Sequence, residues 1–266
     1  MDDMRSLAGK VAVVTGSTQG LGEATARLFA KRGAAGIVIT GRNAERGNAV
    51  ASAIAAEGCK AVFVPADLAD VEDCRRLIAA ADEAFGKLHI LVNVAALTER
   101  GTVWDTSPEL FDRMMAINVR APMLLIQAAY PHLKKSHGCV LNIGSINAYT
   151  GEKNLLAYSI SKGALMTLSR NLADALCYDG VRVNHFNVGW VLTPNEYKTK
   201  LADGLPQNWP EQLEPQFAPS GRILKPEEIA EASVYWLSDE SRPISGTVLE
   251  LEQYPMIGRN PTKRGD

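Results

Sequence analysis

The chain has 266 residues, 46% of them hydrophobic, and a formal net charge of −2 at pH 7. That length suits one large α/β domain with a sizeable core. The near balance of charges offers no cationic footprint, so neither nucleic acid nor a membrane surface is expected as a partner. No apolar run approaches the ~18 residues that span a bilayer, and the N-terminus lacks an apolar signal core, which predicts a cytoplasmic protein.

The spacing of cysteine and histidine disfavours two further classes of protein. The four cysteines form no C-x-x-C pair, and we expect reduced, mostly buried residues at Cys59, Cys74, Cys139 and Cys177. The four histidines show no metal-ligand spacing: His89, His132, His137 and His185. We therefore expect no disulfide framework and no catalytic metal.

Short β-branched runs alternate with Ala-rich stretches of helical period along the chain. Strands are expected at residues 11–15, 37–40, 61–64, 90–92, 140–143, 181–186 and 247–251. Helices are expected at residues 23–32, 44–57, 71–85, 108–134, 157–178 and 226–237, with typical starts at Asp70 and Ser107. This alternation predicts an α/β fold with a parallel sheet between helices, and residues 1–266 read as a single domain.

The first expected strand runs into a glycine-rich turn, Thr15 to Gly22, and then into a helix. Glycines let the backbone approach a pyrophosphate closely, and a helix N-terminus offers unpaired N–H groups and a positive dipole end. We expect a dinucleotide to contact Gly16, Ser17, Thr18, Gln19, Gly20, Leu21 and Gly22. The alternative is a glycine turn that serves only tight packing.

The residues after the second expected strand bear on which dinucleotide is bound. A carboxylate there would select NAD through the ribose hydroxyls, but the chain has Gly41 followed by Arg42. A guanidinium can pair with a 2′-phosphate and stack on adenine, which predicts a preference for NADP, with NAD as the alternative. Arg42 could instead be a solvated loop residue.

Tyr158 and Lys162 lie four residues apart on an expected helix, and Ser145 lies 13 residues upstream of Tyr158. Residues four apart share one helix face. A free tyrosine has a pKa near ~10, and an ammonium close by favours the phenolate. With a serine hydroxyl beside it, the phenol suits proton transfer at an alcohol oxygen. The alternative is an amphipathic helix with a wet tyrosine and a solvated lysine.

Residues 194–220 break the alternation and contain four prolines, Pro194, Pro206, Pro210 and Pro215. A long segment without clear periodicity inside a compact domain is usually functional or mobile. Because it follows the carboxyl end of a strand, where ligands bind in open α/β sheets, it predicts a substrate loop. The alternative is a surface excursion packed by its own aromatic residues.

The pattern T-G-x-x-x-G-x-G at Thr15 to Gly22, together with Asn118, Ser145 and Tyr158-x-x-x-Lys162, resembles the short-chain dehydrogenase/reductase family over nearly the whole chain. The resemblance implies a Rossmann-type, doubly wound, seven-stranded parallel sheet in three α/β/α layers. It also implies an oxidoreductase that moves a hydride between a nicotinamide cofactor and an alcohol or carbonyl compound.

The resemblance also assigns roles. Tyr158 becomes the general acid/base, Lys162 lowers its pKa and holds the nicotinamide ribose, Ser145 orients the substrate oxygen, and Asn118 holds a water. Further cofactor contacts are expected at Asp67, Leu68, Asn93, Ala95, Gly189, Val191 and Thr193. Alternatives remain, since Asn118 could merely distort its helix, Asp67 could cap a helix, and Thr193 could form a turn.

The chain departs from the family pattern in four places. Gln19 stands where NADP-preferring members of the family often have a second basic residue, which weakens the prediction of NADP. Ala96 replaces a glycine beside the cofactor, at a cost of about 1 kcal/mol if the backbone there needs positive φ. Val188-Gly189 stands in place of Pro-Gly and is followed by Trp190, and the usual D-G-G tail reads Glu252-Gln253-Tyr254. These changes affect loop geometry and substrate class rather than the catalytic residues.

The expected substrate pocket is polar with an aromatic wall, lined by Ser145, Asn147, Trp190 and Asn195, with Leu97, Thr98, Glu99, Tyr149, Asn154 and Glu196 as further candidates. Such a pocket favours a sugar, a polyol or a related hydroxy compound. Alternatives are an apolar ketone as substrate, a non-catalytic nucleotide sensor, or an epimerase or dehydratase. The long helices expected at 108–134 and 157–178 favour a homodimer or homotetramer.

Overall fold

The structure is a computed structural model that describes residues 6–257. Its centre is a seven-stranded sheet in the order β3-β2-β1-β4-β5-β6-β7, and every neighbouring pair is parallel. The strands are β1 Val11–Val14, β2 Gly36–Gly41, β3 Lys60–Pro65, β4 Ile90–Asn93, β5 Cys139–Ile143, β6 Arg182–Val188 and β7 Val248–Leu251. The chain reverses its direction of winding between β1 and β4. This confirms the predicted doubly wound fold and places a ligand site at the carboxyl ends of those strands.

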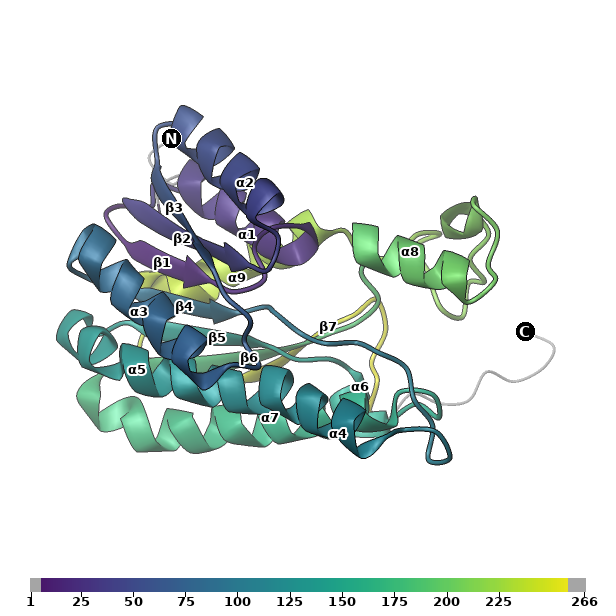
Figure 1. Cartoon of the computed structure of the whole chain (residues 1–266). Helices are drawn as coiled ribbons and strands as arrows, with labels where there is room; N and C mark the ends of the chain where they lie inside the picture. Colours follow the sequence, from purple (N-terminus) through teal and green to yellow (C-terminus); the bar gives the residue numbers. More distant parts are fainter. Residues whose placement is uncertain (1–5, 258–266) are drawn as a thin grey trace.

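Helices cover both faces of the sheet (Figure 1). On one face, α1 Gly20–Lys31, α2 Ala44–Ala56 and α9 Pro226–Leu237 share one apolar core with the strands. On the other face, α3 Val71–Phe85, α5 Ala121–Ser136 and α7 Leu156–Leu176 share a second core. The strands between them are buried on both sides, which explains their continuous β-branched runs.

Side chains fix where these helices begin, as the sequence predicted. The Asp70 carboxylate accepts hydrogen bonds from the backbone N–H groups of Glu72 and Asp73 at the start of α3. The Ser107 hydroxyl accepts one from Leu110 N at the start of α4 Pro108–Met115. Short elements complete the fold: α6 Asn147–Thr150, η2 Cys177–Asp179 and η4 Asp239–Ser241. Within residues 6–257, no helix combines the length and apolarity needed to cross a membrane.

The prediction of a single α-helix over residues 108–134 was wrong. Two α-helices, α4 and α5 Ala121–Ser136, are joined there by a π-helical turn, η1 Ala116–Arg120. Pro122 lacks the N–H that would donate to Asn118 O in an α-helix. The chain instead widens, and Ala121 N donates to Ala116 O, five residues back. Such π-turns occur frequently at functional sites, and this one turns Asn118 toward the loop after β4.

Residues 194–220 are more ordered than the sequence suggested, since they contain α8 Pro194–Ala202 and the short helix η3 Trp209–Glu211. The segment has its own apolar cluster, in which the Trp190 and Trp209 rings stack with centroids 5.3 Å apart and Tyr197 stacks on Trp209 at 6.3 Å. In Figure 1, α8 projects beyond the carboxyl ends of the strands. The segment is therefore both an aromatic-packed excursion and a cover for the strand ends.

Candidate active site

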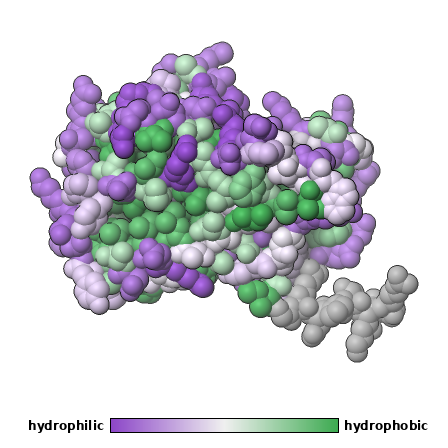
Figure 2. Space-filling model, turned by 60° about the horizontal axis from the view of Figure 1, so that its bottom comes forward, coloured by the Kyte–Doolittle hydropathy of each residue, from purple (hydrophilic) through white to green (hydrophobic). Residues whose placement is uncertain are grey.

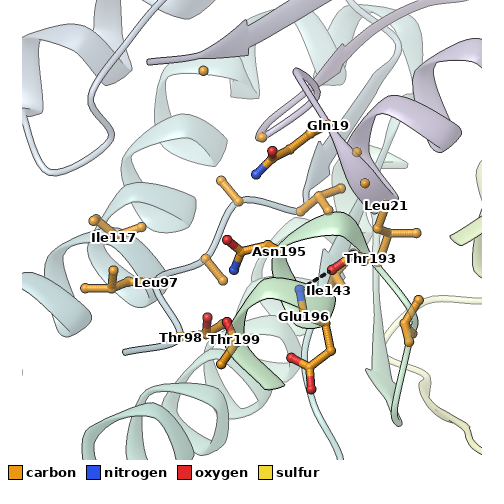
Figure 3. A pocket seen from close by; sticks show the side chains of 18 of the residues that line it. Gln19, Leu21, Leu97, Thr98, Ile117, Ile143, Thr193, Asn195, Glu196 and Thr199 are labelled. Carbon is orange, nitrogen blue, oxygen red and sulfur yellow. Dashed lines mark hydrogen bonds between the residues drawn. The ribbon is translucent and has the colours of Figure 1, made fainter. Parts of the chain in front are cut away.

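A cavity of about 1010 Å³ runs along the carboxyl ends of the strands, from the loop after β2 to α8. Most of the residues predicted for the site line it: Gly16, Thr18, Gln19, Gly20, Leu21, Gly22, Arg42, Asp67, Leu68, Ala95, Ser145, Tyr158, Lys162, Gly189, Trp190, Val191, Thr193 and Asn195. Ser17, Asn93, Asn118 and Asn147 do not line it. Figure 3 shows Gln19 on one side of this cavity, Thr98 and Glu196 on the other, and Asn195 between them.

The glycine loop makes a cradle that side chains would fill. A Cβ on Gly22 would lie 2.4 Å from Gly16 O, and one on Gly16, whose φ is +65°, would lie 2.9 Å from the Ala95 Cα. The loop then passes directly into the N-terminus of α1, where backbone N–H groups have no helical acceptor. A close backbone approach at a helix N-terminus fits the pyrophosphate of a dinucleotide.

Ser17 supports this loop rather than facing the cavity. Its buried hydroxyl donates to Val14 O at 2.6 Å and accepts from Thr40 N at 3.0 Å. The serine thereby ties the turn after β1 to the end of β2. The Ser17 side chain therefore stabilises the glycine loop from its buried side.

Two guanidinium groups line the end of the cavity next to β2. Arg42 follows the strand as expected, and Arg46, which sequence reasoning missed, donates to Gln19 Oε1. Asn43 caps α2 by accepting from Arg46 N at 2.8 Å, which places Arg46 in the first helical turn beside the glycine loop. The signal in the sequence was an N-cap asparagine with a basic residue three positions on.

Asp67 lines the same end of the cavity. Its carboxylate accepts from Ala69 N at 3.0 Å and from Arg113 at 3.1 Å. The Ala69 N–H lowers the pKa of this carboxyl most, and the Arg113 and Arg42 charges lower it further. Asp67 is not the cap of α3, because Asp70 takes that place.

The catalytic candidates come from two neighbouring elements. Tyr158 and Lys162 share one face of α7, and Ser145 follows β5. The Lys162 ammonium donates to Ile143 O at 2.8 Å and lies 5.6 Å from the centroid of the Tyr158 ring. Its burial lowers the pKa of Lys162 to about 8. The structure thus brings the hydroxyl, the phenol and the ammonium to one wall of the cavity.

The pKa of Tyr158 differs from the sequence expectation. Burial, with smaller contributions from the charges of Glu196 and Glu152, raises the pKa of Tyr158 to about 12, and a hydrogen bond with Ser145 opposes the rise. Lys162 is not among the groups that shift the pKa of Tyr158, and its ammonium donates to Ile143 O. Glu196, a candidate for the pocket from the sequence, is therefore an acidic neighbour of the phenol, and Glu152 is a second one that the sequence did not reveal.

Two of the predicted asparagines lie behind the cavity wall. The buried Asn118 amide brackets the Leu97 backbone, accepting from its N–H at 2.8 Å and donating to its carbonyl at 2.9 Å. It also donates to Ser161 Oγ at 2.9 Å, one residue before Lys162. Asn93 donates to Asn142 Oδ1 at 2.8 Å, and its own Oδ1 is buried without a hydrogen-bond partner.

The other end of the cavity, predicted from the sequence to hold the substrate, is built by α8 and the loop after β4. Trp190 donates through Nε1 to Glu196 at 2.8 Å, and Asn147 is directed away, toward Glu152 at 3.4 Å. Residues that sequence reasoning missed also line this end, namely Arg100, Thr199, Ala202 and Asp203. Thr193 caps α8, accepting from Glu196 N, and Pro194 occupies its first turn, a helix-start signal that could have found the residues of α8 but not Arg100.

Arg100 and Asp203 connect the two sides of this end. Two hydrogen bonds join the guanidinium to the carboxylate, at 3.0 and 2.6 Å. Both side chains are about three-quarters buried, at 26% and 28% exposed. The pair ties the loop after β4 to the last turn of α8 across the mouth of the cavity.

The departures from the family pattern have clear structural outcomes. Among residues 6–257, His137 is the one non-glycine with positive φ, so the strain considered for Ala96 is not present. The Glu252 carboxylate accepts from Trp190 N at 2.8 Å and packs on Gly189, where a Cβ would lie 1.8 Å from it. In the same described residues, no group of three His, Cys, Asp or Glu side chains is placed to hold a metal ion.

Comparisons with known proteins agree with this site. A family model described as Enoyl-(Acyl carrier protein) reductase matches residues 16–252. The 2,5-dichloro-2,5-cyclohexadiene-1,4-diol dehydrogenase LinX of Sphingobium indicum is 35% identical over 247 residues, which are 92% of this chain and 96% of the relative.

Solved structures resemble the whole fold. L-sorbose reductase from Gluconobacter frateurii, complexed with NADPH and L-sorbose, superposes with a TM-score of 0.88 at 30% identity, covering 94% of this chain and 97% of that one. A 3-ketoacyl-(acyl-carrier-protein) reductase from Brucella melitensis, complexed with NADH, gives 0.80 at 32% identity, with 92% and 98% covered. The glycine cradle, the Ser145–Tyr158–Lys162 wall and these likenesses together show an oxidoreductase that uses a nicotinamide cofactor on alcohol or carbonyl groups, and the chain belongs to the short-chain dehydrogenase/reductase family.

Proposed function

We propose that the protein is an NADP-preferring oxidoreductase of a sugar, a polyol or a related hydroxy compound. The observation that carries this proposal is the continuity of one cavity from the Arg42–Arg46 end, past the glycine cradle, to Tyr158 and the polar face of α8. The bound nicotinamide supplies or accepts the hydride. The chain itself binds, orients and moves the proton.

In the proposed mechanism, Ser145 and Tyr158 hold the substrate oxygen between them. During oxidation the hydroxyl proton passes to the deprotonated Tyr158 oxygen as the substrate carbon loses its hydride. During reduction the same phenol returns a proton to the carbonyl oxygen. In this proposal the Lys162 ammonium, 5.6 Å from the centroid of the Tyr158 ring, favours the deprotonated form of the phenol during turnover, and Asn118 anchors both the Leu97 loop and the helix that carries Lys162.

The preference for NADP rests on the two guanidinium groups at the β2 end. A 2′-phosphate would meet Arg42 and Arg46 there, and guanidinium pairs well with phosphate. Measuring kcat/KM with NADP and NAD tests this, and Arg46→Gln should reduce the preference by about fivefold to tenfold. A wild-type preference for NAD of about tenfold or more would reject the proposal.

The substrate class rests on the side chains that line the cavity together with Tyr158. Trp190 contributes an aromatic side chain, on whose ring Trp209 stacks and over which the Lys200 ammonium lies at 5.0 Å from the centroid. Asn195, Glu196 and Thr98, which Figure 3 labels, offer hydrogen-bonding groups. Sugars combine apolar ring faces with hydroxyl groups, which such a pocket matches. The L-sorbose complex of the similar Gluconobacter reductase supports the same class.

A substrate panel followed by nicotinamide absorbance tests this assignment. Aldoses, ketoses, polyols, hydroxy acids and apolar alcohols would be assayed in both directions. Turnover with sugars or polyols is the expected result. A wide margin in favour of apolar ketones would replace this substrate class with the alternative weighed from the sequence.

We also propose that the protein forms a homodimer or homotetramer through α5 and α7. An apolar groove lies between these helices, lined by Met123, Ile126, Gln127, Tyr130, Leu172 and Leu176. Figure 2 brings this side of the molecule forward and shows a broad apolar area on it. Light scattering should give a multimer that Met123→Glu weakens, and a monomeric wild type would reject the proposal. The cytoplasmic location stays a prediction.

A further inference from the structure

A buried chain of hydrogen bonds runs beneath the catalytic residues, through β4, β5, α7 and β6. Asn93 donates to Asn142 Oδ1 at 2.8 Å, and Asn142 donates to Ser169 Oγ at 2.9 Å. Ser169 Oγ lies 2.9 Å from His185 Nδ1, and His185 Nε2 lies 2.9 Å from Asn187 Oδ1. All five side chains belong to residues at most 3% exposed. The mechanism proposed above gives no role to Ser169, His185 or Asn187.

The partners of His185 define its proton. Asn187 Oδ1 can only accept, since the amide nitrogen of Asn187 donates to the Met166 sulfur at 3.4 Å. His185 Nε2 must therefore carry hydrogen. Ser169 Oγ accepts from Asn142 and has one proton of its own, which can reach Leu165 O or His185 Nδ1. A neutral imidazole requires the second choice.

The neutral form is the one that this environment favours. Burial lowers the pKa of His185 to about 4, and the charges of Lys162 and Arg170 lower it as well, while the hydrogen bond with Asn187 opposes them. Near pH 7 the ring is uncharged, and its Nε2–H points at Asn187. The chain of donors then runs in one direction, from Asn93 to Asn187.

This last hydrogen bond supports the catalytic segment directly. A Cβ on Gly144 would lie 2.1 Å from His185 Nε2 and 2.5 Å from Asn187 Oδ1, so the Gly144 backbone rests on the pair. Gly144 joins Ile143, whose carbonyl accepts from Lys162, to Ser145. A shift of the pair would therefore move the lysine anchor and the serine together.

We propose that His185 is a positioning residue for this enzyme. Its neutral form, with hydrogen on Nε2, donates to Asn187 and thereby fixes the position of the Ile143–Gly144–Ser145 backbone. The imidazole touches no reacting atom and acts only through that segment. The proposal rests on the hydride-transfer function, and it predicts that changes at His185 alter kcat rather than cofactor affinity.

Three substitutions separate the two ring nitrogens. His185→Gln can return a donor at the place of Nε2, whereas His185→Asn can return a group only at the place of Nδ1, and His185→Leu removes both. We expect kcat to fall about tenfold or more in the Leu and Asn variants and to recover largely in the Gln variant. The Kd for the cofactor, measured by fluorescence titration, should change less than kcat.

Asn184→Ala is the matched control, because Asn184 is a buried polar residue of the same strand. Its side chain serves the segment before β7, donating to Ile244 O at 3.3 Å and accepting from Thr247 N at 3.1 Å. We expect it to lower Tm without the kcat loss. Equal kcat losses in the Leu and Asn184→Ala variants at equal Tm, or equal recovery by Gln and Asn, would overturn the proposal.

A measurement on the unaltered protein keeps the proposal testable if the Leu variant does not fold. NMR of protein labelled with ¹⁵N-histidine reports the tautomer of His185 without any assay of activity. A protonated Nε2 with an unprotonated Nδ1 near pH 7 is the expected result. The opposite tautomer, or an imidazolium, would overturn the proposal even in an active enzyme, and failure of the substrate panel would leave this readout intact.

Discussion

The two ends of the cavity are built by different means. At the cofactor end, backbone meets backbone, as at Gly22, where an added Cβ would lie 2.4 Å from Gly16 O. At the substrate end, side chains hold α8 in place through the Trp190–Trp209 stack and the Arg100–Asp203 pair. The difference teaches that the cofactor end tolerates little change, whereas the substrate end can be re-formed by substituting a few side chains.

The strongest test lies where the two ends meet, at Tyr158. Tyr158→Phe removes the oxygen that we propose carries the proton, so we expect kcat to fall by about 10³-fold or more while cofactor binding persists. Tyr178→Phe is the control, since Tyr178 is 94% exposed. Turnover of Tyr158→Phe within a few-fold of the wild type would remove the phenol from the mechanism.

The cofactor end can be tested with one methyl group. Gly22→Ala places a Cβ against backbone that cannot move aside, and we expect the cofactor Kd to rise about tenfold or more. Gly163→Ala adds the same methyl inside α7, where the nearest atom, Ala148 O, is 3.6 Å away. That control should bind cofactor normally and gain up to about 1 kcal/mol of stability. Similar behaviour of the two variants would refute the backbone-cradle explanation.

Measuring the free energy of unfolding as a function of pH tests the buried hydrogen-bond chain that contains His185. The pKa of His185 falls from 6.5 to about 4 on folding, so between these values the unfolded state binds more protons than the native state. The stabilisation from the neutral ring is present above about pH 6.5 and is lost as pH falls through about 4. We expect a loss on the order of 3 kcal/mol from this group, measured by denaturant unfolding. His185→Gln should remove that part of the slope, and an unchanged slope would contradict the assignment.

The smallest effect is expected at the Arg100–Asp203 ion pair, which joins the two sides of the substrate end. Asp203→Asn weakens the pair with Arg100, and because both side chains are about one-quarter exposed, the loss is at most about 1 kcal/mol. The substrate KM should rise a few-fold while the cofactor Kd stays constant. Arg75→Ala, which breaks a surface pair with Glu72, is the control. Equal changes in cofactor Kd and substrate KM would mean that the two ends do not act separately.

Sequence reasoning found the strands, the glycine cradle and the Tyr158–Lys162 face because each is a local pattern with a fixed period. It missed α8, where the prolines obscured a helix that Thr193 and Pro194 begin. The π-turn before Pro122 depends on one missing N–H, which breaks no periodicity. The His185 chain was beyond reach, since it joins residues 49, 27, 16 and 2 positions apart.

The residues just after β7 bear on how the protein should be handled. The Glu252 carboxylate accepts from Trp190 N, and Gln253 accepts from Ser220 N and donates to Arg222 O. The residues after β7 therefore contact both ends of the segment that contains α8. A purification tag or an immobilisation linker fused after this strand would pull on those contacts. Attachment at the N-terminal side, where β1 enters the middle of the sheet, leaves them undisturbed, and kinetic work should begin with that form.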